Sequence, residues 1–198
     1  LKMRIALTGN PNSGKTTMYN VLTGRNERVG NWAGVTVDKK ESRIKKSLYE
    51  GKEELMAVDL PGAYSMSPFT SEENITSEYI KNEKPDVIIN IVDATNLSRS
   101  LFFTTQLLEL GIPVVIALNK KDINDKKGTV IDTKELSEKL HVPVIDTVSS
   151  GSDDEGIKEV VRAALDRRGE SQISVYEASE ENLCSKEAAI EADKNRFT

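Results

Sequence analysis

The amino-acid sequence predicts an α/β domain in three layers, with helices on both faces of a mostly parallel sheet. Short apolar runs alternate with helical patterns along the chain to about residue 168, which is the rhythm of successive strand–helix–strand units. Residues 87–92 read Val-Ile-Ile-Asn-Ile-Val and are apolar on both faces, as in a central strand that helices cover from each side. We therefore expect a six-stranded sheet with one antiparallel edge strand.

The elements are expected in alternating order along the chain. Strands are expected at residues 5–8, 55–59, 87–92, 114–118 and 144–147, and helices at residues 15–22, 71–81, 97–110, 133–140 and 157–167. Residues 35–58 are the exception, because Thr36, Val37 and Ile44 lead through Leu48 into a turn at residues 50–52. That pattern predicts a hairpin, which supplies the antiparallel edge strand.

Composition limits the classes of function. The 198 residues carry a formal net charge of -5, which argues against nucleic acid as the main partner. The single cysteine, Cys184, excludes an internal disulfide and suits a reducing compartment. No apolar stretch approaches the length of a membrane span, and the early first strand leaves no room for a signal peptide. We expect one cytosolic domain at residues 1–168 and a short, partly helical appendage at residues 169–198.

Residues 9–16 match the phosphate-binding pattern G-x-x-x-x-G-K-[ST], between an expected strand and an expected helix. Glycines let backbone N–H groups turn toward a β-phosphate, and the helix N-terminus adds positive potential. Lys15 brings a charge to the phosphate oxygens and Thr16 offers its hydroxyl to Mg²⁺. A glycine turn that only caps a helix would explain neither residue. The expected phosphate-binding residues are Gly9, Asn10, Pro11, Asn12, Ser13, Gly14, Lys15, Thr16 and Thr17.

A second motif, Asn119-Lys120-Lys121-Asp122, follows the expected strand at residues 114–118, at the edge where open α/β sheets bind ligands. The Asp122 carboxylate can accept hydrogen bonds from both N1–H and N2–H₂ of guanine, whereas adenine lacks the second donor. Alone, the motif could be an Asp-initiated loop. Beside the phosphate loop it predicts guanine recognition by Asn119, Lys120 and Asp122.

A third motif, Asp59-Leu60-Pro61-Gly62, completes the set. Asp59 ends an apolar strand and is expected to hold Mg²⁺ through water, while the Gly62 N–H meets the γ-phosphate. Thr36 is the candidate second Mg²⁺ hydroxyl. Because loss of the γ-phosphate would release Thr36 and Gly62 together, residues 25–40 and 62–75 are expected to be two switch segments. The three motifs predict a P-loop GTPase with a Ras-like fold, in which Lys15, Thr36 and Gly62 serve hydrolysis.

Two further blocks narrow this class. Residues 29–37 (Val-Gly-Asn-Trp-Ala-Gly-Val-Thr-Val) and 59–69 (Asp-Leu-Pro-Gly-Ala-Tyr-Ser-Met-Ser-Pro-Phe), taken with residues 9–16, closely resemble the cytosolic N-terminal G domain of the FeoB ferrous-iron transporters. The resemblance covers about residues 3–168. It implies GTP binding and slow GTP hydrolysis as the cytosolic switch of an iron transporter of the inner cell membrane, whose own membrane domain is the partner.

The resemblance also implies further site residues. GTP would be bound in addition by Gly34 and Val35, and by the loop that reads guanine O6, here Val148, Ser149 and Ser150. Ser150 stands where this class usually has alanine. Besides Mg²⁺, a K⁺ ion would sit beside the phosphates, held by Asn12 and by backbone carbonyls around Gly30 and Trp32. Such a cation would offset charge that develops in the transition state.

Ala63 follows Gly62, where many small GTPases carry the glutamine that orients the attacking water. A methyl group cannot orient water, so we expect slow intrinsic turnover. Glu72 and Glu73 are expected to be solvated acids in the first turn of a helix. His141 has no second ligand at metal spacing and is expected to lie on the surface.

Alternatives remain open at this point. A soluble GTPase of ribosome or tRNA assembly would share the three nucleotide motifs, although a basic RNA-binding domain would be expected with it. A nucleotide-binding regulatory module with negligible hydrolysis is favoured by Ala63, and the sequence leaves open a homo-oligomer. Residues 191–197 are similar to the run that precedes the first membrane helix in FeoB proteins. We therefore expect the helical spacer of that family to be absent or much shortened here, with membrane segments following in the full-length protein.

Overall fold

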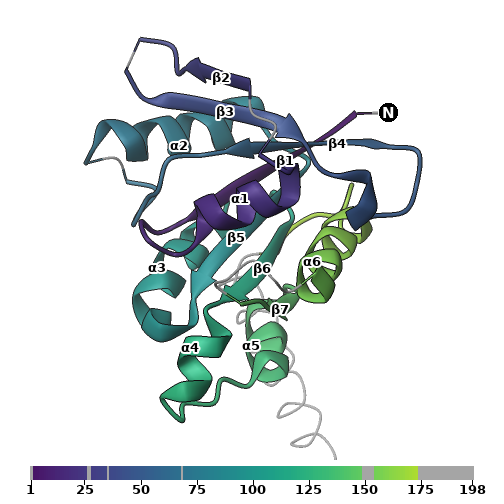
Figure 1. Ribbon diagram of the computed structural model, residues 1–198. Coiled ribbons are helices and arrows are strands. Elements are labelled where there is room, and N and C mark those ends of the chain that lie inside the picture. Colours follow the sequence, from purple (N-terminus) through teal and green to yellow (C-terminus); the bar gives the residue numbers. More distant parts are fainter. Residues whose placement is uncertain (1, 26–27, 35, 68, 149–153, 174–198) are drawn as a thin grey trace, which may run out of the picture.

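A seven-stranded sheet forms the middle layer of the domain (Figure 1). The computed structural model describes residues 2–25, 28–34, 36–67, 69–148 and 154–173. Within them the strand order is β2-β3-β4-β1-β5-β6-β7. The strands are β1 (Lys2–Gly9), β2 (Arg28–Asn31), β3 (Asp38–Arg43), β4 (Glu54–Asp59), β5 (Val87–Asp93), β6 (Val114–Asn119) and β7 (Val144–Asp146).

Pairing is parallel from β4 through β1, β5 and β6 to β7. β3 pairs antiparallel with both β2 and β4. The predicted three-layer α/β class with one antiparallel strand is thus confirmed, but the prediction of six strands is wrong and the antiparallel strand lies second from the edge. The edge strand β2 was missed because Arg-Val-Gly-Asn contains a single large apolar residue and no alternating pattern.

Helices cover both faces of the sheet (Figure 1). They are α1 (Lys15–Thr23), α2 (Ser71–Glu83), α3 (Leu97–Leu108), α4 (Lys121–Lys126), α5 (Thr133–Leu140) and α6 (Asp154–Asp166), with single 3₁₀ turns η1 (Lys46–Leu48) and η2 (Ala94–Asn96). All five predicted helices are present. The polar helix α4 was not predicted, because six residues with one apolar side chain show no helical period.

Two apolar clusters lie on opposite faces of the sheet. One joins α1 and α6, through Leu22 and Val160, to Ile5 and Ile89 of the central strands. The other joins α2, α3 and α5, through residues such as Ile80 and Phe103, to the neighbouring strand residues. Successive strand residues therefore bury their side chains on alternate faces, as expected for continuous apolar runs. Each fully buried large side chain contributes about 1.5–3 kcal/mol.

The last described residues of the chain lie at the edge of the sheet where β6 begins. Gln172 is buried, and its side-chain Oε1 accepts from the backbone N–H of Val114 at 3.3 Å and from Arg167 at 2.9 Å. Its backbone N–H donates to the Gly111 carbonyl at 3.3 Å. Val114 is the first residue of β6, so Gln172 lies at the end of this strand opposite the Asn119–Asp122 motif.

The ends of several elements bear on the predictions. His141 ends α5 with a φ of 55° and is exposed, as predicted. Residues 174–198 of the expected appendage, which include Cys184, lie outside the described residues. None of the helices in the described ranges is long and apolar enough to span a bilayer.

Candidate functional site

The predicted motifs gather at one edge of the sheet. β1 ends at Gly9, β4 at Asp59, β5 at Asp93 and β6 at Asn119. The register pairs Leu7 with Asp59 and Asp93 with Asn119. Because these strands run parallel, their carboxyl ends meet at the same edge, which is where ligands bind in folds of this kind.

The phosphate loop has a backbone shape that its sequence requires. Between β1 and α1, Asn12 and Gly14 have φ values of 64° and 95°, and the Ser13 N–H donates to the Asn10 carbonyl at 3.1 Å. A Cβ on Gly14 would lie 2.1 Å from the amide nitrogen of Asn119. Only glycine combines this left-handed backbone with so close a neighbour.

The first two residues of the base motif donate side-chain hydrogen bonds to backbone carbonyls of the phosphate loop. The Asn119 amide donates to the Ser13 carbonyl at 3.0 Å, and the Lys120 ammonium donates to the Asn12 carbonyl at 2.7 Å. The side-chain oxygen of Asn119 in turn accepts from the Thr147 hydroxyl at 3.1 Å. In a trans peptide the N–H points opposite to the C=O. The Ser13 carbonyl faces Asn119, so the Gly14 N–H is directed away from β6 toward the phosphate side.

Lys15 and Asp59 form an ion pair at the start of α1. Their side chains are only 11% and 10% exposed, so each charge depends on the other or on a ligand for compensation. Thr16 follows in the exposed first turn of the helix. A hydroxyl and a carboxylate are the hard oxygen ligands that Mg²⁺ prefers, so Thr16 and Asp59 fit that ion.

An open cavity of about 760 Å³ lies over the phosphate loop. It is lined by Asn10, Pro11, Asn12, Gly14, Lys15, Thr16, Thr17, Gly62, Tyr64, Thr70, Glu72, Glu73 and Lys120. The cavity therefore brings together most of the predicted phosphate-binding residues, Gly62 from the third motif and Lys120 from the base motif.

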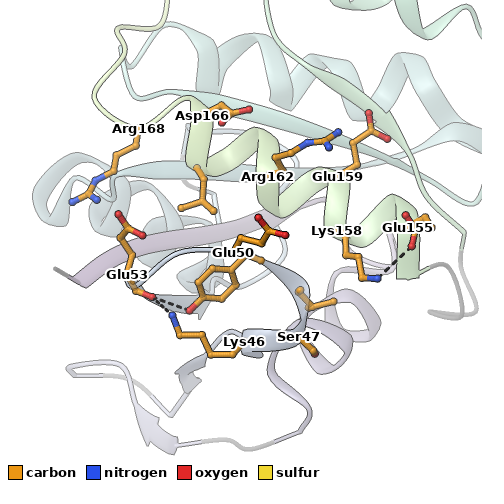
Figure 2. A pocket seen from close by; sticks show the side chains of 13 residues that line it. Lys46, Ser47, Glu50, Glu53, Glu155, Lys158, Glu159, Arg162, Asp166 and Arg168 are labelled. Carbon is orange, nitrogen blue, oxygen red and sulfur yellow. Dashed lines mark hydrogen bonds and ion pairs between the residues drawn. The ribbon is translucent and has the colours of Figure 1, made fainter.

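A larger cavity, of about 890 Å³, lies between the η1 region and α6 (Figure 2). No motif residue lines it, and its charged side chains are of both signs. The Lys46 ammonium donates to the carbonyls of Gly51 and Glu53. Its contact with Glu53 and the pair of Lys158 with Glu155 are visible in Figure 2. The chemistry of the motifs selects the smaller cavity as the candidate site.

The described part of the first switch segment does not line the phosphate cavity. Thr36 is exposed, and Cβ atoms added at Gly30 or Gly34 would have no neighbour within 4 Å. Trp32 instead packs edge-on against Tyr79 of α2, with ring centroids 5.4 Å apart, and Lys39 lies 5.0 Å from the centroid of its ring. The predicted Mg²⁺ role of Thr36 and K⁺ roles of Gly30 and Trp32 thus stay predictions. Val35 lies outside the described residues.

Hydrogen bonds hold both ends of the second switch segment. The Ala63 N–H donates to the Gly9 carbonyl at 3.1 Å, and the Thr76 hydroxyl donates to the Pro61 carbonyl at 2.9 Å. A Cβ on Gly62 would lie 3.1 Å from Pro11 of the phosphate loop. Gly62 therefore sits against the loop, where its N–H was predicted to meet a γ-phosphate.

The prediction that Glu73 is solvated is wrong. Its residue is 6% exposed, and its carboxylate accepts from the backbone N–H groups of Tyr64 and Phe69 at 3.1 and 3.2 Å. Thr70 is the N-cap of the same helix, because its hydroxyl accepts from the Glu73 N–H at 3.1 Å. The carboxylate is buried because the second switch segment folds back over it. Glu72 is exposed, as predicted.

Asp93 and Gln106 are among the residues near the site that were not identified from sequence. Asp93 accepts from Lys120 at 2.7 Å, and Gln106 of α3 accepts from the Met66 N–H at 2.7 Å. Asp93 carried the same signal as Asp59, an acid directly after an apolar strand. Gln106 had no such signal. Asp122 lies in the first turn of α4 and Val148 is partly buried after β7, whereas Ser149 and Ser150 lie outside the described residues.

The sheet order, the phosphate loop and the base motif define the class of protein as a P-loop GTPase domain. A family model described as "Ferrous iron transport protein B" matches residues 3–164, and the chain belongs to that family. It is 47% identical over 170 residues to the Fe(2+) transporter FeoB of Salmonella typhimurium, covering 84% of this chain and 21% of that protein. The chain thus spans about a fifth of the length of this relative.

Solved structures of FeoB domains superpose on this chain. A point mutant of S. thermophilus NFeoB bound to GDP superposes with a TM-score of 0.75 at 48% identity, covering 82% of this chain and 61% of that one. The G domain of the T. maritima FeoB iron transporter superposes with a TM-score of 0.75 at 34% identity, covering 84% of this chain and 98% of that one.

Proposed function

We propose that this chain binds GTP and GDP in the phosphate-loop cavity and hydrolyses GTP slowly, as the cytosolic switch of a ferrous iron transporter. One observation carries the proposal: Asn119 and Lys120 of the base motif hold the Ser13 and Asn12 carbonyls of the phosphate loop beside the cavity. The residues predicted to read the base and those predicted to bind the phosphates therefore form one unit. A point mutant of S. thermophilus NFeoB was solved with bound GDP, which supports the same ligand here.

The chain's own groups have clear parts in the proposed reaction. Lys15, at the base of the cavity, would neutralise charge on the β- and γ-phosphates once a ligand replaces its contact with Asp59. Asn119 and Lys120 would keep the loop in shape, and the Asp122 carboxylate would accept from guanine N1–H and N2–H₂. Water then attacks the γ-phosphorus and GDP and inorganic phosphate leave. Ala63 is buried and apolar, so no side chain at this position orients that water.

Two cations are proposed with the nucleotide. Mg²⁺ would be held by Thr16 and by Asp59 through water, with Thr36 added when the first switch segment closes, and would offset charge between the phosphates. K⁺ would be held by Asn12, whose residue is exposed at the rim of the cavity. Asn12 is the residue that supports a K⁺ site here, because the described residues of the first switch segment, among them Gly30 and Trp32, do not line the cavity.

The test measures hydrolysis by the 198-residue chain in single turnover, with Mg²⁺ and either KCl or NaCl. We expect phosphate release that is slow, faster in KCl, and lost on Lys15→Ala. Binding of GTP without phosphate release above the Lys15→Ala background would instead establish a regulatory module without hydrolysis, the candidate that the buried Ala63 favours. Failure of GDP to displace a fluorescent guanine nucleotide would overturn the proposed function altogether.

The transport role concerns the full-length protein. We propose that the domain acts on the membrane domain of its own protein, from the cytoplasmic side. Ferrous iron uptake by cells that express the full-length protein should fall when Lys15→Ala is introduced, because the switch can no longer bind nucleotide. Unchanged uptake at equal protein level would contradict a switch role.

A further inference from the structure

Asp93 lies at the edge of the sheet that carries the nucleotide motifs. It is the last residue of β5, its partner in the register is Asn119, and its side chain is 15% exposed. The two carboxylate oxygens have different partners. Oδ1 accepts from the Thr95 N–H at 2.9 Å and from the Thr95 hydroxyl at 2.6 Å, whereas Oδ2 accepts from the Lys120 ammonium at 2.7 Å. One oxygen fixes the η2 turn and the other faces the site.

Lys120 connects Asp93 to the phosphate loop. Its backbone is left-handed, with a φ of 64°, and its ammonium bonds both to Asp93 and to the Asn12 carbonyl at 2.7 Å. Asn12 is itself left-handed, a conformation that costs free energy in any residue but glycine. The Asn12–Ser13 peptide is held at both ends, because its C=O accepts from Lys120 and its N–H donates to the Asn10 carbonyl.

We propose that Asp93 is a positioning residue of the nucleotide site, which holds the Lys120 ammonium on the Asn12 carbonyl and thereby keeps the phosphate loop in its binding shape. Without the Asp93 charge, Lys120 would keep one neutral acceptor and its flexible chain could turn to solvent. The Asn12–Ser13 peptide would then lose the contact that opposes its rotation. The carboxylate is charged at neutral pH: burial alone raises the pKa of Asp93, but hydrogen bonds from Lys120 and Thr95 outweigh burial and lower it below the ordinary value.

This inference rests on the proposed function, because it concerns how the loop that binds GDP is kept in shape. It is tested by the dissociation rate of methylanthraniloyl-GDP from the 198-residue chain. In Asp93→Asn, the remaining oxygen can still accept from Thr95 while an NH₂ group faces the Lys120 ammonium. Because a hydrogen bond between charged groups is lost at the loop, we expect dissociation to be faster by about 10-fold or more.

Three further variants separate positioning from a merely structural effect. Thr95→Val removes a bond to Oδ1 only and should leave the dissociation rate within about 2-fold, although it lowers the thermal midpoint of the nucleotide-free chain. In a Lys120→Met background, Asp93→Asn should add less than about 2-fold, since Asp93 acts through Lys120. Asp93→Glu keeps the charge and should bind GDP more tightly than Asp93→Asn, which also covers the case that Asp93→Asn folds poorly.

The outcomes are distinguishable. Unaltered dissociation in Asp93→Asn, full additivity with Lys120→Met, an equal loss in Thr95→Val, or no advantage of Asp93→Glu would each overturn the positioning role. If the unaltered chain does not bind the labelled GDP at all, the proposed function fails first. If it binds and the Asp93 variants match it, only the role of Asp93 fails.

Discussion

The phosphate loop and the first switch segment lie at the same end of the domain but are held very differently. Two consecutive carbonyls of the loop, at Asn12 and Ser13, accept bonds from side chains of the base motif. The described switch residues have one large side chain packed inward, Trp32 against Tyr79, while Thr36 is exposed. The phosphate cradle is therefore held in shape by the chain's own side chains. The first switch segment is held by the β2–β3 pairing and by Trp32, and none of its described residues lines the phosphate cavity, so the γ-phosphate and cations would have to supply its closed position.

The largest effect is expected at the phosphate loop, where the ligand would bind. Lys15→Ala removes the phosphate-binding charge and leaves the Asp59 carboxylate facing the phosphates, so GDP affinity should fall by about 100-fold or more. Titration with methylanthraniloyl-GDP measures this. Lys46→Ala is the matched control, because Lys46 lies in the larger cavity and bonds to local carbonyls. A similar loss in both variants would show that general charge, and not the loop, binds the ligand.

The second prediction compares two left-handed glycines, one in each region. Gly14→Ala would place its Cβ 2.1 Å from Asn119 at a φ of 95°, whereas Gly34→Ala would meet nothing within 4 Å at a φ of 79°. We expect the free energy of unfolding to fall by about 3 kcal/mol for Gly14→Ala and about 1 kcal/mol for Gly34→Ala. Urea unfolding of the nucleotide-free chain measures both. Equal losses would mean that the loop is not packed more tightly than the switch.

The third prediction concerns the second switch segment, whose attachment is intermediate between that of the phosphate loop and that of the first switch segment. Glu73→Ala leaves the Tyr64 and Phe69 N–H groups without their acceptor and should cost about 1–3 kcal/mol of local stability. Hydrogen exchange at the amides of residues 62–70 should then be faster. Glu72→Ala, on the neighbouring exposed position, should leave exchange unchanged. If both variants behave alike, the burial of Glu73 has no consequence for the segment.

The smallest expected effect is a change in tryptophan fluorescence. The sequence contains one tryptophan, and Trp32 lies in the first switch segment with its indole N–H buried and without a hydrogen-bond partner. Closure over the γ-phosphate should move this ring away from Tyr79, so a non-hydrolysable GTP analogue should shift Trp32 emission to longer wavelength relative to GDP. The Lys15→Ala chain should show no shift. Identical spectra with both nucleotides in the unaltered chain would indicate that the segment does not move.

The phosphate loop was predictable from sequence because its contacts are local or set by parallel strands. The short phosphate-binding pattern predicts Gly14 and Lys15. The apolar runs predict where β1 and β6 end. The burial of Glu73 was not predictable, because the same residue at the same place in a helix is exposed unless a distant loop covers it. The pairing of Asp93 with Lys120 depends on a left-handed backbone at Lys120, which the identity of a lysine does not indicate.

The attachment of Gln172 to the first residue of β6 has a mechanical consequence. Tension on the chain beyond residue 173 would load the Val114 end of β6, while the base motif sits at the other end of the same strand, about 17 Å away. β6 is paired with β5 from Val114 to Asn119 and with β7 from Ile116 to Leu118, so a load directed along the strand would act in shear across several hydrogen bonds at once. Hydrogen bonds that are loaded together in shear resist force better than bonds that break one after another. A pull at the Val114 end would therefore reach the guanine-reading end without unfolding the strand between the two ends.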